Sequence, residues 1–318
     1  MFKAEVKSFE ASAPYNRYDS LLEVPNGKNP NQNAWLTIKL RVKLNFADKN
    51  NPVPGLTIQK NGKWYAQDWS LNRTSGWLFP LLTWGDAYKD KFRKQFQQHA
   101  EKVWNWQFLL ITPRNYSELD YTSFDGPGWL VRPNVLCLFR LEITDSNPHR
   151  TINVVNLDWT TTQVVNNDPT THPNPKNITK PFDAGTFRSD ASDYDDADLF
   201  KPYMYNKKDN VWHDTIGHEI GHALGQDHIM ILQGDETCKT PTEGTGADAC
   251  YGKTEWDKYN IMGKGDRIYL LNAISWRQRM ALHTQGKTTA DNWQPTGIMN
   301  TPPRKMALGA SLIGVPTF

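Results

Sequence analysis

Residues 34–46 read AWLTIKLRVKLNF and alternate apolar with polar side chains along their length. The apolar positions are Leu36, Ile38, Leu40, Val42, Leu44 and Phe46. Successive side chains of a strand point to opposite faces of its sheet, so a period of two places all six on one face. The stretch therefore predicts a long β-strand with one buried face.

The residues that follow predict a long helix and several shorter elements. From Trp84 to Trp104, aromatic and alanine side chains recur every four residues among charged and amide side chains, which is typical of an amphipathic helix. Apolar runs and periodicities predict further strands at 107–112, 135–143 and 151–157, and further helices at 211–224 and 268–283.

This order of elements predicts a single α/β domain with a small sheet over residues 34–285. Residues 1–33 are rich in Asn, Pro and Ser, which is typical of a loose arm. Residues 286–318 contain four prolines and are predicted to form a C-terminal tail.

The composition indicates a folded, nearly neutral protein. Its 318 residues include 36 Lys and Arg against 34 Asp and Glu, a formal net charge of +2, and 13 Trp, 13 Phe and 12 Tyr. This aromatic content excludes disorder over most of the chain, since disordered chains are poor in such residues. The balanced charge argues against nucleic acid as a partner, because proteins that bind it concentrate basic residues on one face.

The sequence contains no apolar run of the roughly 18 residues that a membrane-spanning helix needs. Lys3, Glu5, Lys7 and Glu10 stand where the apolar core of a signal peptide would lie. We therefore expect no membrane span. We expect a protein that is extracellular or is exported by a route without an N-terminal signal peptide, with the cytoplasm as the alternative.

Two of the three cysteines, Cys238 and Cys250, flank a loop rich in Gly, Thr and Asp. A disulfide between them would close a short loop and would stabilise the fold by about 3 kcal/mol. It would also suit an oxidising compartment. The alternative is two unrelated surface thiols. Cys137 lies within the apolar run VLCLF and is predicted to be an inert core residue.

The segment that predicts chemistry is HDTIGHEIGHALGQDHIM, residues 213–230. His218 and His222 are four residues apart, so on a helix they lie about 40° apart around the axis and one turn apart along it. Both imidazoles can then face one metal ion. Glu219 lies about 100° round from His218, beside the metal, where a carboxylate can take a proton from metal-bound water.

Gly225 can end this helix in the left-handed conformation, because glycine has no Cβ to strain. The turn would bring His228 back toward the helix as a third nitrogen ligand. Structural zinc sites are closed by four protein ligands, whereas three histidines and an open position describe a catalytic zinc site.

The run from His218 to His228 resembles HExxHxxGxxH, the signature of the metzincin zinc metallopeptidases, which also carry a methionine turn downstream. Met262, in YNIMGKG, takes the place of that turn, and in the family this methionine forms a hydrophobic floor beneath the histidines. The resemblance implies a zincin-like fold, with a small twisted mixed sheet, a long backing helix, the active-site helix, the methionine turn and a C-terminal helix.

The resemblance also implies an endopeptidase with one catalytic zinc ion and a peptide or protein substrate. Water activated by the metal attacks the peptide carbonyl, while Glu219 accepts its proton and later donates it to the leaving amine. Family substrates lie extended along an edge strand. Residues 151–159 are the candidate edge, and an interior strand is the alternative. The alternative function is a binding or structural module, or the cargo of a secreted particle, with little turnover.

Three positions depart from the family pattern. Ile229 follows the third histidine, where the subfamilies carry Ser, Glu, Asp or Pro, so no subfamily is assigned. Gln226 replaces the usual Leu. Lys264 stands two residues after Met262, where some subfamilies place a tyrosine that assists the oxyanion. We hypothesise that Lys264 or Tyr259 stabilises the transition-state oxyanion. The alternative is a solvated lysine on a turn.

Acidic residues near the predicted helix allow two further predictions. Residues 189–200 hold five aspartates whose oxygens could bind Ca²⁺, and the alternative is a solvated acidic loop. The five are Asp190, Asp193, Asp195, Asp196 and Asp198. Asp214 precedes His218 by one turn, where a carboxylate either orients a metal ligand or interacts with the helix dipole. We expect the dipole interaction.

Overall fold

The computed structural model describes residues 7–9, 17–25, 32–67, 77–123, 129–158, 165–166, 187, 189–235, 238, 250–297 and 304–307. This part contains both helices and strands, and its largest sheet mixes parallel with antiparallel pairs. The coarse α/β class is therefore confirmed. The chain divides into two compact units, and the prediction of one domain between an arm and a tail stays a prediction. The first unit comprises Met1–Leu40, Val103–Arg140 and Ile268–Phe318, and the second comprises Arg41–Lys102 and Leu141–Arg267.

Strand pairing in the first unit is largely antiparallel. Its strands are β1 (Lys7–Phe9), β2 (Asp19–Glu23), β7 (Leu109–Ile111), β8 (Tyr121–Ser123), β9 (Trp129–Arg132), β16 (Gln294–Thr296) and β17 (Arg304–Ala307), together with the first parts of β3 (Ala34–Ala47) and β10 (Val135–Ile143). The large sheet has the order β1-β2-β3-β10-β7-β16, and β17-β9-β8 form a separate sheet. Strands β2 and β16 fall within the segments predicted as arm and tail.

The described residues of this unit include the helix α7 (Ile274–His283), which follows the 3-10 turn η3 (Leu270–Ala273), with η4 (Ala290–Asn292) later in the chain. The indole of Trp276 is fully buried and donates a hydrogen bond to the carbonyl of Leu138 at 3.0 Å. Its ring also packs against Phe108, with centroids 5.4 Å apart. The α7 helix therefore packs on β10, and the helix predicted over 268–283 is α-helical only from Ile274.

The second unit places parallel strands beside the end of β3. β11 (Arg150–Val155) pairs in parallel with β3 on one side and with β13 (Asp193–Asp195) on the other. It is thus an interior strand, and the predicted edge at 151–159 is wrong. The other strands of the unit are β4 (Thr57–Lys60), β5 (Lys63–Gln67), β6 (Trp77–Pro80), β12 (Val165–Asn166), β14 (Met204–Asn206) and β15 (Val211–Trp212).

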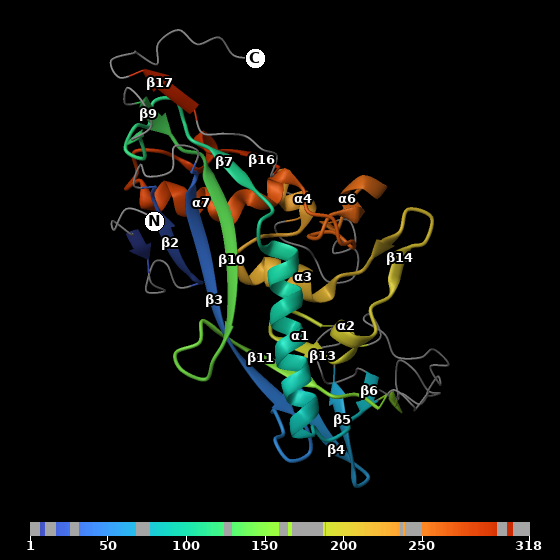
Figure 1. Ribbon diagram of the computed structural model, residues 1–318. Helices are drawn as coiled ribbons and strands as arrows, with labels where there is room; N and C mark the ends of the chain where they lie inside the picture. Colours follow the sequence, from blue (N-terminus) through green and yellow to red (C-terminus); the bar gives the residue numbers. More distant parts are fainter. Residues whose placement is uncertain are drawn as a thin grey trace. The chain divides into compact units, whose positions relative to one another are not determined.

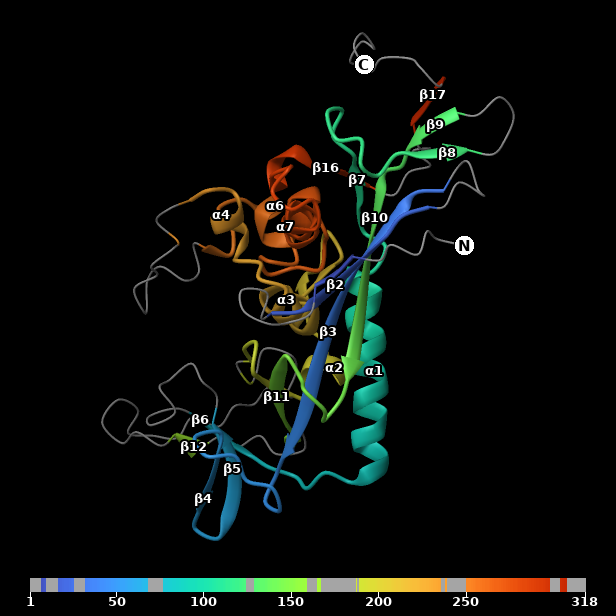
Figure 2. The same ribbon diagram turned by 90° about the vertical axis from the view of Figure 1, so that its left-hand side faces the viewer.

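The long helix α1 (Asp86–Trp104) runs alongside β3 (Figures 1 and 2). Residues at the predicted four-residue spacing face the core, since Phe92, Phe96 and Ala100 are fully buried. The ring of Phe92 meets that of Phe46 on β3 edge-on, with centroids 6.0 Å apart. The predicted amphipathic helix is confirmed, and its apolar face packs on the sheet.

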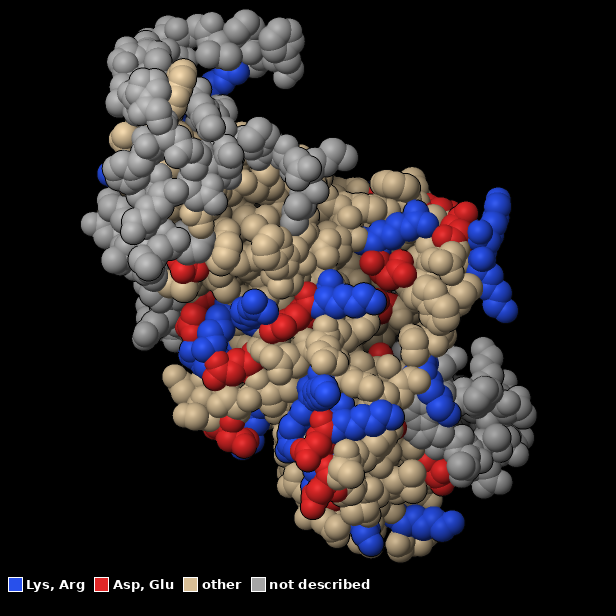
Figure 3. Space-filling model, in the orientation of Figure 1, with Lys and Arg blue, Asp and Glu red and all other residues tan. Residues whose placement is uncertain are grey.

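Short helices among the described residues of the second unit are α2 (Ala197–Phe200), α3 (Thr215–Ala223), α4 (Ile229–Leu232) and α6 (Glu255–Tyr259). Within the described ranges, no helix has both the length and the apolar character needed to cross a membrane. Figure 3 shows Lys and Arg interspersed with Asp and Glu on the face in view.

Candidate metal centre

The helix α3 begins at an aspartate cap. The Oδ1 of Asp214 accepts the backbone N–H of Gly217 at 2.8 Å, which satisfies a donor that the first turn leaves unpaired. The preceding residues Val211–Trp212 pair with β14, so the helix begins four residues later than the predicted 211–224. Asp214 therefore acts at the helix N-terminus, in line with the expected dipole interaction.

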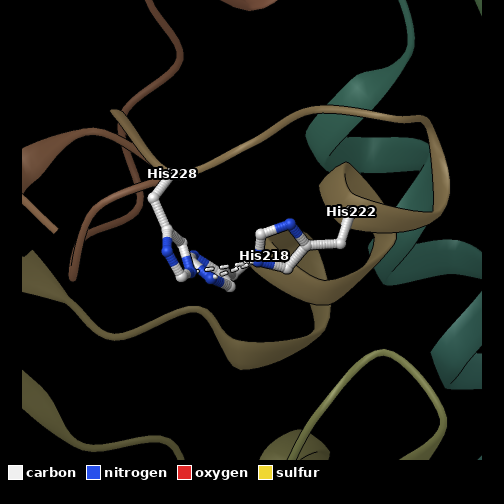
Figure 4. A group of neighbouring side chains, drawn as sticks. All are labelled: His218, His222 and His228. Atoms are coloured by element: carbon white, nitrogen blue, oxygen red, sulfur yellow. Dashed lines mark hydrogen bonds between the residues drawn. The ribbon is translucent and has the colours of Figure 1, made fainter. Parts of the chain in front are cut away.

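The same helix ends in the predicted left-handed turn. Gly225 has φ +80°, its N–H bonds the carbonyl of His222, and the N–H of Gln226 bonds the carbonyl of Gly221. These two bonds form a Schellman motif, which satisfies the last carbonyls of the helix. The chain then reverses, and Figure 4 shows His228 returning from the loop toward the two histidines of α3.

The three imidazoles converge on one point. The Nε2 of His222 lies 3.1 Å from the Nε2 of His218 and 3.2 Å from that of His228. Nitrogen ligands at 2.0–2.1 Å from a tetrahedral zinc ion would lie about 3.3 Å apart, close to these separations. Among the described residues, these histidines are the group whose ligand atoms converge tightly enough to hold a metal ion. The predicted metal ligands are thus brought together.

Backbone carbonyls orient two of the rings. The Nδ1 of His218 lies 2.7 Å from the carbonyl of Ile261, and the Nδ1 of His222 lies 2.7 Å from that of Gln226. A carbonyl only accepts, so each Nδ1 carries the proton and each Nε2 presents a lone pair. Two lone pairs facing each other at 3.1 Å repel, and a bound cation removes that repulsion. The donor set therefore fits a metal ion.

The electrostatics keep these rings neutral. Burial lowers the pKa of His218 well below its ordinary range, and the neighbouring imidazoles lower it further. Burial also lowers the pKa of His228 to about 3. Metal binding requires the deprotonated nitrogen, so the site does not have to release protons at neutral pH before it binds an ion.

The predicted methionine turn adjoins this site through its backbone. The carbonyl of Met262 accepts the N–H of Ile229 at 2.9 Å, and its own N–H donates to the Oδ1 of Asn260 at 2.8 Å. The preceding carbonyl, of Ile261, is the one that orients His218. Both Met262 and Ile229 are fully buried. The turn thus supports two of the three ligands, one from α3 and one from the loop.

Glu219 follows the first ligand on α3, and its side chain is 9% exposed. Burial raises the pKa of its carboxyl well above the ordinary range, and the negative charges of Asp190 and Asp198 raise it further. A carboxyl with a raised pKa beside a metal site can serve as both acceptor and donor of a proton.

The two predicted oxyanion residues lie in different surroundings. Tyr259 donates its hydroxyl proton to the carboxylate of Asp209 and accepts a hydrogen bond from Asn206. The ammonium of Lys264 lies 5.8 Å from the centre of the Tyr251 ring, which itself packs on the histidines. Lys264 is thus the candidate whose charged group lies over a residue of the site.

Tyr251 is a site residue that the sequence reasoning missed. The centre of its ring lies 4.2 Å from that of His228 and 5.7 Å from that of His218. It directly follows Cys250, which forms a disulfide with Cys238. The bridge decides between the two cysteine predictions in favour of the disulfide. The position of Tyr251 directly after Cys250, a cysteine of the predicted disulfide, is the one signal in the sequence that could have pointed to this tyrosine.

The acidic segment is buried, so the alternative of a solvated loop is wrong for its central aspartates. Asp193, Asp195, Asp196 and Asp198 are each less than 9% exposed. Asp195 and Asp198 accept each other's backbone N–H groups at the start of α2, and Asp196 accepts the hydroxyl of Tyr88. These contacts are structural, and Ca²⁺ binding stays a prediction.

The chain matches no protein-family model, no curated protein and no solved structure.

Proposed function

We propose that the chain is a zinc-dependent endopeptidase of the metzincin type with a zincin-like fold. The observation that carries the proposal is the convergence of three neutral imidazole nitrogens, two of them on α3, the helix that also bears the buried carboxyl of Glu219. Imidazole ligands suit zinc, and three of them leave a fourth position open for water. A retired enzyme would have no need of Glu219, which disfavours the alternative of a binding module.

When bound, zinc supplies the Lewis acidity that makes water a nucleophile near neutral pH and polarises a carbonyl. Glu219 would accept the proton from that water. Burial raises the pKa of this carboxyl and so makes its ionised form the stronger proton acceptor, and the carboxylic acid formed by that transfer would pass the proton to the leaving amine. The carbonyls of Ile261 and Gln226 hold two of the imidazoles in the tautomer that binds metal.

The Cys238–Cys250 disulfide supports the proposed location of the protein in an oxidising, extracellular compartment. Disulfides persist where thiols are not kept reduced. Mass spectrometry of the protein taken from its natural compartment, without reductant, should find these two cysteines linked. Free thiols at both positions would contradict the location.

The test measures the zinc content of the purified protein and its cleavage of a denatured protein mixture. Glu219→Gln preserves the shape of the side chain and removes its proton chemistry, so zinc should stay bound while cleavage falls by about 100-fold or more. The exposed Glu255 provides the matched control, and Glu255→Gln should cleave like the natural protein.

The outcomes separate the two functions. One equivalent of zinc with cleavage that Glu219→Gln abolishes supports the peptidase. Zinc bound by both proteins with cleavage by neither favours the binding or structural module. Absence of zinc from the natural protein, even after incubation with the ion, would overturn the metal site and the peptidase together.

A further inference from the structure

The three metal-binding histidines are not held in the same way. His218 and His222 lie on one helix and each bonds a backbone carbonyl through Nδ1. His228 lies on a loop and is half-buried. Among the residues that the structure describes, none forms a hydrogen bond to the Nδ1 of His228. The orientation of the third ring therefore depends on packing.

The ring packed most closely on His228 is that of Tyr251. Their centres are 4.2 Å apart with 40° between the planes, whereas the imidazoles of His222 and His228 are 4.8 Å apart. Tyr251 also reaches His218, at 5.7 Å. An aromatic ring at this distance excludes the volume into which the imidazole would otherwise rotate.

The backbone around Tyr251 is fixed on both sides. Cys250 precedes it and is bonded to Cys238, and both cysteines are buried. Gly252 follows it with φ +133°, and a Cβ there would lie 2.7 Å from the backbone nitrogen of Lys258. A Cβ on Gly263 would lie 2.8 Å from the carbonyl oxygen of Tyr251. The tyrosine is thus attached to a rigid segment.

The disulfide links this segment to the residues that follow His228. The helix α4 starts directly after His228, the N–H of Asp235 bonds the carbonyl of Met230, and that of Cys238 bonds the carbonyl of Asp235. The path therefore runs from His228 through α4 to Cys238, across the bridge to Cys250, and through Tyr251 back to the imidazole. The path starts and ends at the third predicted ligand.

We propose that Tyr251 is a positioning residue for the metal ligand His228, and that the Cys238–Cys250 disulfide holds it in place. The aromatic face is the part that acts, because the contacts to the histidines are ring to ring. The inference rests on the metal-binding part of the proposed function and does not depend on peptidase activity.

The experiment measures Zn²⁺ affinity by competition with a chromophoric chelator. Support of a ligand from outside the coordination sphere is typically worth about 10- to 100-fold in affinity. Tyr251→Ala should therefore bind Zn²⁺ about 10- to 100-fold more weakly, and Tyr251→Phe should bind it like the natural protein. Trp256→Ala, an exposed aromatic on α6, is the matched control and should leave the affinity unchanged.

The double variant C238S/C250S should bind Zn²⁺ more weakly by a similar factor. Adding Tyr251→Ala to it should cost little more, because both changes remove the same support. The absorption spectrum of the Co²⁺-substituted proteins gives a second readout of ligand geometry, and it should change in Tyr251→Ala but not in Tyr251→Phe. If Tyr251→Ala fails to fold, Tyr251→Leu, which keeps apolar bulk without the aromatic face, takes its place with the same expected loss.

Equal Zn²⁺ affinity in Tyr251→Ala and the natural protein would overturn the inference and leave the proposed function intact. A loss of affinity in Tyr251→Phe as large as in Tyr251→Ala would assign the effect to the hydroxyl and would also overturn it. Weak binding in Tyr251→Ala, together with a natural protein that binds Zn²⁺ but cleaves nothing, would support the inference and contradict the peptidase.

Discussion

The Nε2 of His99, on α1, lies 2.8 Å from the Oδ1 of Asp214, the residue that caps α3, the helix that carries His218 and His222. The same carboxylate oxygen accepts the backbone N–H of Gly217. One side chain thus satisfies the helix terminus and joins α3 to the helix that packs on the sheet. We therefore expect the anchoring of α3 to depend on pH.

Burial opposes the charged form of His99, but the hydrogen bond and charge of Asp214 outweigh it and raise the pKa of His99. A raised pKa contributes stability that is full below the unfolded value of about 6.5 and is lost as pH rises through the folded value. In thermal unfolding of the metal-free proteins, the melting temperature of the natural protein should therefore exceed that of His99→Gln at pH 6. This difference should shrink toward pH 9.

The comparison with His99→Gln isolates this pair from other titrating groups, since glutamine can still donate to Asp214 but carries no charge. The buried carboxyls Asp195 and Asp198 titrate in both proteins, so their effect on stability cancels in the difference. A difference in melting temperature that stays constant from pH 6 to pH 9 would contradict the prediction.

Met262 should tolerate a change of shape but not a loss of volume. Its side chain is fully buried, and its backbone bonds both Ile229 and Asn260. Met262→Ala should lower the free energy of unfolding by about 2–5 kcal/mol through the cavity that it leaves. Met262→Leu conserves volume and should cost less than about 1.5 kcal/mol. Urea unfolding measures both, and a loss in Met262→Leu as large as that in Met262→Ala would contradict the expected tolerance of shape.

Periodic burial made β3 and α1 predictable from sequence. The buried residues of β3 alternate strictly from Ala34 to Leu44, and those of α1 recur at steps of four. The pattern of apolar residues within each element therefore shows by itself which face is buried. The start of α3 was mispredicted for a non-local reason. Val211 is apolar and fits the helical pattern, but it pairs with Asn206 in the β14–β15 hairpin.

The same distinction holds at the candidate site. His218, His222 and His228 lie close together in the sequence. A helix followed by a glycine turn is therefore enough to bring their three imidazoles together. Tyr251 contacts His228 beside a disulfide that links Cys238 to Cys250, and a contact of this kind leaves no periodic pattern in the sequence. Tyr259 is the other residue predicted to stabilise the oxyanion. Its hydroxyl bonds Asp209, a contact that sequence separation of 50 conceals.

Lys264 is one of the two predicted oxyanion residues, and its role can be tested by removing the charge alone. The ammonium lies over the ring of Tyr251, which packs on the histidines. Lys264→Met keeps the apolar stem, so kcat should fall by about 100-fold or more if the charge stabilises the oxyanion, as for other donors to that position. Lys258→Met, on α6, is the control. Unchanged turnover in Lys264→Met would contradict this role and would favour the alternative of a solvated lysine on a turn.

Zinc should stabilise the protein only through the three histidines. An ion that binds the folded state alone adds RT ln(1 + [Zn²⁺]/Kd), about 4 kcal/mol at a free concentration 1,000 times Kd. Chelation should therefore lower the melting temperature of the natural protein and of His99→Gln, which retains every ligand. His222→Ala lacks the nitrogen that lies within 3.2 Å of both others, so added zinc should not raise its melting temperature. A rise equal to that of the natural protein would place the bound zinc elsewhere on the chain.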